Sequence, residues 1–158
     1  MAKKSFTLTL ENNKTEKEAL NFLINQDSRF YLPSLKQKKK ILNHLDIDHK
    51  YVKAFDLILL KEPLTTGSII TEKQLKECEI IEVKSTKKHL PNNPKGFFFG
   101  ATENEFNLVE KVEAKNHTIR FCFVCLNQKS KSYELLTIKE VEKMIQSKRT
   151  QYQIHFKK

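Results

Sequence analysis

The sequence predicts an α/β (α+β) protein in which a central mixed β-sheet is flanked by helices. Apolar runs of strand length occur at residues 52–60, 79–84 and 118–126. Around them, Thr residues followed three positions later by Glu mark helix starts, because this pair forms a capping box. With 158 residues, the chain can bury one substantial core. We expect residues 1–50 to be an N-terminal segment on or before a core of residues 51–158.

The first fifty residues predict one strand and two helices. Apolar and polar residues alternate at 5–10, which indicates a half-buried strand. Thr15, with Glu18 three positions later, is expected to cap the first helix. After a connection at 27–32, Ser34 is expected to open a second, lysine-rich helix.

The remaining elements follow from the same signals of period, capping and turn residues. In order, we predict a strand at 52–60, a helical turn at 71–75, a strand at 79–84, an aromatic strand at 96–100, a helix from Thr102, strands at 118–126 and 132–136, a helix at 137–146 and an edge strand within the tail at 149–158.

The net charge of +10 and the isoelectric point near 9.5 indicate a polyanionic partner. Nucleic acid is favoured over a membrane, because no basic amphipathic helix with a bulky apolar face stands out. The alternative is a lysine-rich, solvated surface without a specific partner. The sequence has no signal peptide and no apolar run long enough to span a bilayer, so we expect a cytoplasmic protein.

Two groups of residues have partial metal-site spacing. Cys122 and Cys125 lie two residues apart, but inside an apolar strand and without a second pair, so we interpret them as core cysteines. Asp46, Asp48 and His49 could also bind a metal, but nothing near them in the sequence completes a site. A polar turn is the favoured interpretation there.

Three charged residues lie in apolar strands, where charges are costly unless they are paired or bind a metal. Asp56 interrupts the run at 52–60, and Glu82 and Lys84 share one face of the next strand. Consecutive strands usually neighbour each other, so the three side chains could converge. Such a trio suits hydrolysis of a phosphodiester assisted by Mg²⁺. The backbone carbonyl of Val83 is a natural third ligand, and Lys84 would position or deprotonate the attacking water, helped by a depressed pKa.

At this point the sequence resembles the PD-(D/E)xK restriction-endonuclease-like nuclease superfamily. The residues that match its motif are Asp56 and Glu82-Val83-Lys84, with Phe55 where a Pro often precedes the Asp. The similarity is closest to the Mrr-like branch, in which Glu-Val-Lys-small-Thr precedes an aromatic segment and a helix that begins Thr-x-Asn-Glu. The corresponding residues here are 82–86, 97–99 and 102–105, and the resemblance covers roughly Lys53 to Met144.

The resemblance implies a restriction-endonuclease-like core and a Mg²⁺-dependent endonuclease, with Mn²⁺ as a substitute metal. Asp56 and Glu82 would bind the metal and Lys84 would assist the water. Asn104, Glu105 and Thr86 are secondary candidates, since Glu105 can equally serve as a capping-box residue and Asn104 can simply fill the first helical turn. A small type II restriction enzyme or a defence-system nuclease would act on double-stranded DNA, as a homodimer with one site per strand.

Candidate DNA-binding residues are basic residues in two clusters that could contact phosphates: Lys36, Lys38, Lys39, Lys40, Lys87 and Lys88. The cluster at residues 36–40 can equally be a solvated face. The alternative to an enzyme is a nucleic-acid-binding module that has the fold but no catalysis, recognisable by salt-sensitive binding without Mg²⁺ dependence. In that case the candidate catalytic residues would have no catalytic role. Asp56 would be a surface residue on an edge strand, and Glu82 and Lys84 would be a pair on an exposed strand.

Overall fold

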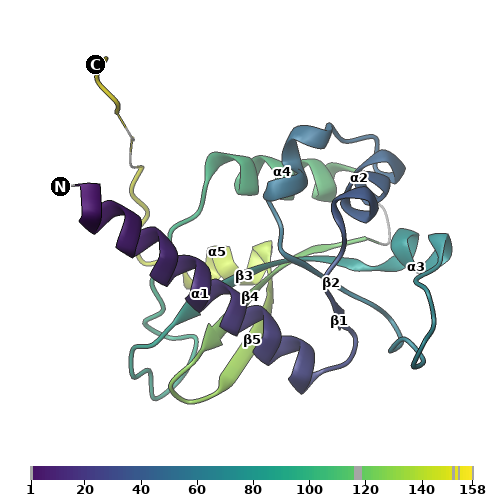
Figure 1. Cartoon of the computed structure of the whole chain (residues 1–158), viewed down its shortest axis with the longest axis horizontal. Helices are drawn as coiled ribbons and strands as arrows, with labels where there is room; N and C mark the ends of the chain where they lie inside the picture. The colour runs from purple at the N-terminus through teal and green to yellow at the C-terminus, as the bar shows by residue number, and fades with distance from the viewer. Residues whose placement is uncertain (1, 116–118, 151, 153, 158) are drawn as a thin grey trace.

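The computed structural model of the chain describes residues 2–115, 119–150, 152 and 154–157, residues 2–13 by their backbone alone. Within them, five strands form one mixed sheet in the order β1-β2-β3-β4-β5, with five α-helices around it (Figure 1). The predicted α/β class is therefore confirmed. The elements are α1 (Ala2–Gln26), β1 (Phe30–Tyr31), α2 (Leu35–His44), the 3-10 helix η1 (His49–Lys53), β2 (Leu57–Leu59), α3 (Glu72–Glu77), β3 (Glu79–Thr86), α4 (Glu103–Ala114), β4 (Phe121–Asn127), β5 (Ser132–Thr137) and α5 (Ile138–Met144).

The sheet is antiparallel except at its centre, where β3 and β4 run parallel and α4 connects them. A parallel pair requires such a crossover, because its strands cannot be joined by a tight turn. Leu57 pairs with Ile81 across β2 and β3, and Glu82 pairs with Phe123 across β3 and β4. Asp56 directly precedes β2 and therefore lies beside Glu82, as the adjacency of consecutive strands predicts.

The two faces of the sheet are covered by different helices (Figure 1). On one face, α1 packs Ala19 and Leu23 into a cluster that includes Ile81. On the other face, side chains of α2, α3, α4 and α5 form a larger cluster that includes Ile80. Alternate residues of a strand point to opposite faces, so Glu82 and Lys84 share the face of Ile80.

Side-chain caps fix the starts of four helices. Ser34, Thr71, Thr102 and Thr137 each accept a hydrogen bond from the backbone N–H three residues later, and each makes a reciprocal capping box. A cap of this kind satisfies donors that the first helical turn leaves unpaired. The predicted helix starts at these residues are confirmed.

The predictions for the N-terminus are wrong. Residues 5–10 lie within α1 and not in a strand, and Thr15 lies in the middle of this helix instead of capping it. A helix extends at the gain of one hydrogen bond per residue once it has started, and the sequence contains no Pro or Gly before Pro33 to stop it. A six-residue alternation is too short a signal to outweigh this. None of the helices in the described ranges is long and apolar enough to cross a membrane.

Other predicted strands are shorter than expected or are not strands. The run at 52–60 divides into the end of η1 and the three residues of β2, and β1 occupies part of the predicted connection at 27–32. The aromatic residues 97–99 form no ladder, because β4 already pairs with β3 and β5 on both of its edges. The described part of the tail, residues 149–150, 152 and 154–157, contains no strand. Residue 118, the predicted start of a strand, lies outside the described residues, and β4 begins at Phe121.

All three cysteines are buried free thiols. Burial raises the pKa of Cys78 and of Cys122 to about 12, so neither is a thiolate near neutral pH. The interpretation of Cys122 and Cys125 as core residues is confirmed.

Candidate active site

Asp56 is fixed against β3 by two hydrogen bonds. Its backbone N–H donates to the carbonyl of Ile81 at 2.9 Å, and its Oδ2 accepts from the backbone N–H of Val83, also at 2.9 Å. At the end of the β2–β3 ladder, the Asp56 carboxylate thus accepts the hydrogen bond that a backbone carbonyl would otherwise accept. These bonds hold the Asp56 side chain next to Glu82, on which its charge acts directly.

Glu82, Lys84 and Glu105 form a buried ionic triad. The Lys84 ammonium lies 2.9 Å from Oε1 of Glu82 and 2.8 Å from Oε2 of Glu105. Each of the three side chains is about nine-tenths buried. A pair of opposite charges in such a setting is strong only if its remaining atoms are also satisfied, and one lysine here bridges two carboxylates. The apolar strand β3 and the start of α4 therefore meet at a charged centre.

Glu105 has both of the roles that the sequence left open. Its Oε2 accepts from the backbone N–H of Thr102 at 3.2 Å, and Thr102 Oγ1 accepts from the N–H of Glu105, which completes the capping box. The same Oε2 accepts from Lys84. The capping box therefore holds the carboxylate in place for Lys84, so the helix start is part of the site.

Lys38 reaches the site from α2. Its Nζ donates to the carbonyl of Phe55 at 2.6 Å and lies 4.8 Å from the centre of the Phe55 ring. The N–H of Val83 donates to the Asp56 carboxylate and not to the carbonyl of Phe55. The Phe55 carbonyl can therefore accept from Lys38. Burial lowers the pKa of Lys38, against the opposing charges of Asp56 and Glu82.

Lys38→Met is expected to lower the free energy of unfolding by about 1 to 3 kcal/mol, because it leaves the buried Phe55 carbonyl without its donor. Lys39→Met is the matched control, since Lys39 is an exposed neighbour on the same helix and surface changes are usually within about 0.5 kcal/mol. Urea unfolding of both variants measures the difference. Equal midpoints would show that Lys38 contributes nothing to this end of β2.

Glu16 on α1 is a fourth acid at the site. Desolvation by the neighbouring protein and the charge of Asp56 raise the pKa of its carboxyl, while Lys84 and Lys38 oppose the rise. Together with Asp56, Glu82, Glu105, Lys38 and Lys84 it makes a group of four acids and two lysines, with a charge of −2 if all are ionised. This local excess of negative charge stands out in a chain of net charge +10.

The pKa of Glu82 reflects its burial and the neighbouring acid Asp56. Burial and the Asp56 charge raise it to about 9, and Lys84 opposes the rise. For Lys84, burial alone lowers the pKa, but Glu82 and Glu105 outweigh it and the pKa is raised. The expected depression of the Lys84 pKa is therefore wrong for the metal-free protein, because the sequence does not reveal that a second carboxylate, Glu105, meets the Lys84 ammonium.

The remaining candidate residues are spread around the site and differ in exposure. Asn104 is exposed beside Glu105. Thr86, at the end of β3, accepts from the backbone N–H of Lys88. Of the two lysine clusters, Lys36, Lys39, Lys87 and Lys88 are exposed, whereas Lys40 pairs with Glu72 and Lys38 is held by Phe55. The first predicted cluster thus divides between the surface and the site. Glu16 had no sequence signal as a site residue, and Lys38 was predicted only as a DNA-binding residue, since a charge on a helix does not reveal what it faces.

The donor atoms at the site suit a hard divalent cation. Among the described residues, Oδ1 of Asp56 and Oε2 of Glu82 have no hydrogen-bond partner, and two carboxylates with water are a usual set for Mg²⁺. Nowhere in the described part of the chain do three or more His, Cys, Asp or Glu side chains form a group that could hold a metal. The site therefore fits an ion that keeps much of its water and does not fit a fully protein-enclosed metal.

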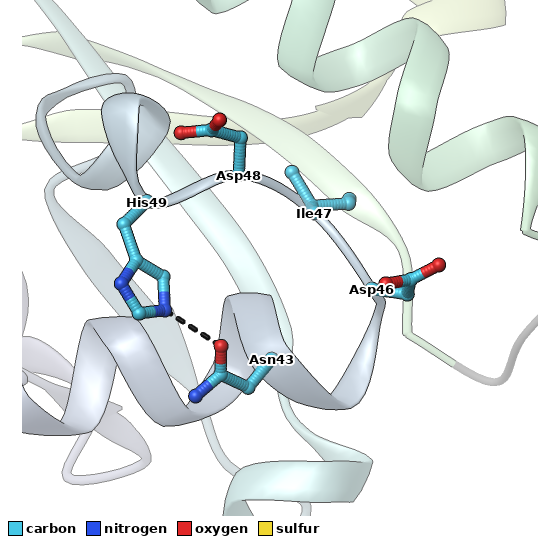
Figure 2. A pocket seen from close by; sticks show the side chains of 5 residues that line it. All are labelled: Asn43, Asp46, Ile47, Asp48 and His49. Carbon is cyan, nitrogen blue, oxygen red and sulfur yellow. Dashed lines mark hydrogen bonds between the residues drawn. The ribbon is translucent and has the colours of Figure 1, made fainter.

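A shallow depression of about 500 Å³ lies elsewhere, at the turn after α2, and is lined by Asn43, Asp46, Ile47, Asp48 and His49 (Figure 2). His49 Nε2 lies 2.6 Å from Oδ1 of Asn43, while Asp48 caps η1 and Asp46 pairs with Lys115. Figure 2 shows the two carboxylates and the imidazole pointing in different directions. The interpretation of this segment as a polar turn is confirmed.

Comparison of the chain with protein-family models, with curated proteins and with solved structures finds no match.

Proposed function

We propose that the protein is a Mg²⁺-dependent endonuclease that hydrolyses phosphodiester bonds of DNA. The observation that carries this proposal is the position of Asp56 against the backbone of β3, next to the buried triad of Glu82, Lys84 and Glu105. The cluster of acidic side chains at the site, beside lysine-rich surface segments, favours a divalent cation in the site and a polyanion over it. The resemblance of residues 56 and 82–84 to the PD-(D/E)xK motif points to the same reaction.

Asp56 and Glu82 would hold the cation through their free oxygens, with the carbonyl of Val83 as a candidate third ligand. A bound Mg²⁺ would make its water more acidic and neutralise charge that develops on the phosphate. Lys84, a cation fixed by Glu82 and Glu105, would orient the attacking water and donate to the phosphate oxygens. Glu105 would keep the Lys84 ammonium in place, and Lys38 would keep Asp56 oriented through the Phe55 carbonyl.

A second candidate is a nucleic-acid-binding module without catalysis. The buried triad of Glu82, Lys84 and Glu105 favours this candidate, because Lys84 already bonds to two carboxylates and such a network can be purely structural. In that case the exposed lysines would bind phosphates, affinity would fall steeply with salt, and Mg²⁺ would have no specific effect.

Cleavage of supercoiled plasmid by the purified protein, with Mg²⁺ or with EDTA, separates the two candidates. The nuclease proposal expects nicked or linear product with Mg²⁺ and none with EDTA, and product formation lost in Lys84→Met. Lys73→Met is the matched control, because Lys73 is an exposed lysine of α3. Wild-type protein without Mg²⁺-dependent cleavage, or Lys84→Met as active as wild type, would refute the proposal. A homodimer with one site per strand is expected for double-stranded cleavage.

A further inference from the structure

The loop that follows β3 is hydrogen-bonded to β4, the strand that pairs with β3 at the site. Asn127 Nδ2 donates to the carbonyl of Lys88, and Asn93 Nδ2 donates to the carbonyl of Cys125, both at 3.1 Å. Cys125 is the register partner of Lys84 in the β3–β4 ladder. Backbone bonds from Lys95 to Asn92 and from Phe97 to Pro94 close turns within the loop. These hydrogen bonds therefore hold the loop of residues 87–98 in a defined conformation beside the site.

The three phenylalanines at the end of this loop divide into two directions. The rings of Phe97 and Phe99 lie 6.1 Å apart, so these side chains share one side of the chain. Phe99 packs on Phe123 at 5.9 Å, and the Lys84 ammonium lies 5.8 Å from the Phe99 ring. Phe98 lies between them and is 81% exposed, so its ring is presented to solvent one residue away from the Lys84 contact.

The charged residues of the loop that carries Phe98 are all basic. Lys87, Lys88 and Lys95 are exposed on the same loop, and the sequence contains no Asp or Glu from residue 85 to residue 102. An exposed aromatic ring on a basic loop suits a strand of nucleic acid, whose phosphates can pair with lysines while a base stacks on the ring. A base inside a duplex is already stacked on its neighbours, so a ring of this kind takes an unpaired base.

We propose that Phe98 stacks on an unpaired base of the substrate strand, and that the loop of residues 87–98 thereby directs the site to DNA with unpaired bases next to the scissile phosphate. The inference rests on the proposed function for the identity of the substrate, and it names the substrate class more narrowly. Its test uses binding without metal, so its outcome is independent of cleavage.

The chain contains no Trp, so Phe98→Trp introduces a single fluorescent reporter at this position. In EDTA, a single-stranded oligonucleotide is expected to quench its emission to saturation, and a blunt duplex of the same sequence is expected to quench it much less. Ile69→Trp is the matched control, because Ile69 is 86% exposed on the connection between β2 and α3. Equal quenching by duplex and single strand, equal quenching in the two variants, or no quenching would overturn the proposal.

Phe98→Leu gives a second readout, since it keeps an apolar side chain but removes the stacking face. It is expected to weaken binding of the labelled single strand about 5- to 100-fold by fluorescence anisotropy, with the thermal midpoint unchanged. Unchanged affinity would overturn the inference even in a protein that cleaves DNA. Stacking without any Mg²⁺-dependent cleavage would instead refute the nuclease proposal and leave the base-binding role of Phe98 in place.

Discussion

Asp56→Asn is expected to lower Mg²⁺-dependent cleavage of DNA at least about 100-fold while the protein stays folded. The amide keeps an oxygen that can accept from the backbone N–H of Val83, so the end of β2 keeps its geometry. It removes the charge that would hold the cation in the proposed reaction, and charge stabilisation of this kind is usually worth two or more orders of magnitude in rate. Initial rates on plasmid DNA, with circular dichroism to check the fold, measure the effect.

Asp46→Asn is the matched control for that substitution. Asp46 has a positive φ of 53°, which Asn also tolerates, and its carboxylate is fully exposed beside Lys115. The control is expected to cleave like wild type. Asp56→Asn retaining most of the wild-type rate would mean that this carboxylate does not take part in the reaction.

Glu82→Gln is expected to make the metal-free protein more stable near neutral pH. Between pH 4.5 and about 9, the folded protein keeps a proton on Glu82 that the unfolded chain releases, so stability falls as pH rises through this window. The raised pKa is therefore a cost to the stability of the fold that grows as the pH rises from 4.5 toward about 9. Gln is neutral in both states and keeps the shape, which removes the cost. Thermal unfolding in EDTA at pH 7.5 and pH 5 should give a rise of several °C that shrinks at the lower pH.

Added Mg²⁺ is expected to reverse this order. Binding to the folded state alone stabilises a protein in proportion to the logarithm of ligand concentration, so wild type should gain stability with Mg²⁺ and Glu82→Gln should gain much less. Glu110→Gln, an exposed change on α4, should behave like wild type in both conditions. If metal-free Glu82→Gln were less stable than metal-free wild type near neutral pH, the inference that the buried carboxyl of Glu82 lowers stability would be contradicted.

The parts of the fold that the sequence predicted correctly have strong local signals. Capping boxes located the starts of α4 and α5, and the apolar strand with an internal charge pair located β3. Predictions failed where the signal was short or the outcome depended on neighbours. Residues 5–10 join a helix because nothing in the sequence stops it. Residues 97–99 form no strand; Phe99 packs on Phe123 of β4, and both edges of β4 are already paired.

The candidate site was predicted in part. Asp56 lies beside Glu82 as expected from strand adjacency, and Glu105 proved to bond to Lys84 as well as to cap its helix. The role of Lys38 could not be predicted, because its contact with Phe55 depends on how α2 packs against the start of β2. The same holds for the raised pKa of Lys84, which requires two carboxylates 23 positions apart in sequence to meet at one ammonium. Folding brings these charges together, and local sequence patterns do not predict contacts between residues so far apart in the chain.

The position of a divalent cation in the folded protein tests the central claim most directly. A crystal soaked in Mn²⁺, with anomalous data collected near the manganese edge, locates the ion without relying on activity. We expect a single strong peak in contact with carboxylate oxygens of Asp56 and Glu82, at about 2.0 to 2.3 Å, and no such peak in Glu82→Gln crystals. A peak that avoids both carboxylates, or no peak at saturating Mn²⁺, would contradict the assignment of this site as a metal-dependent nuclease centre.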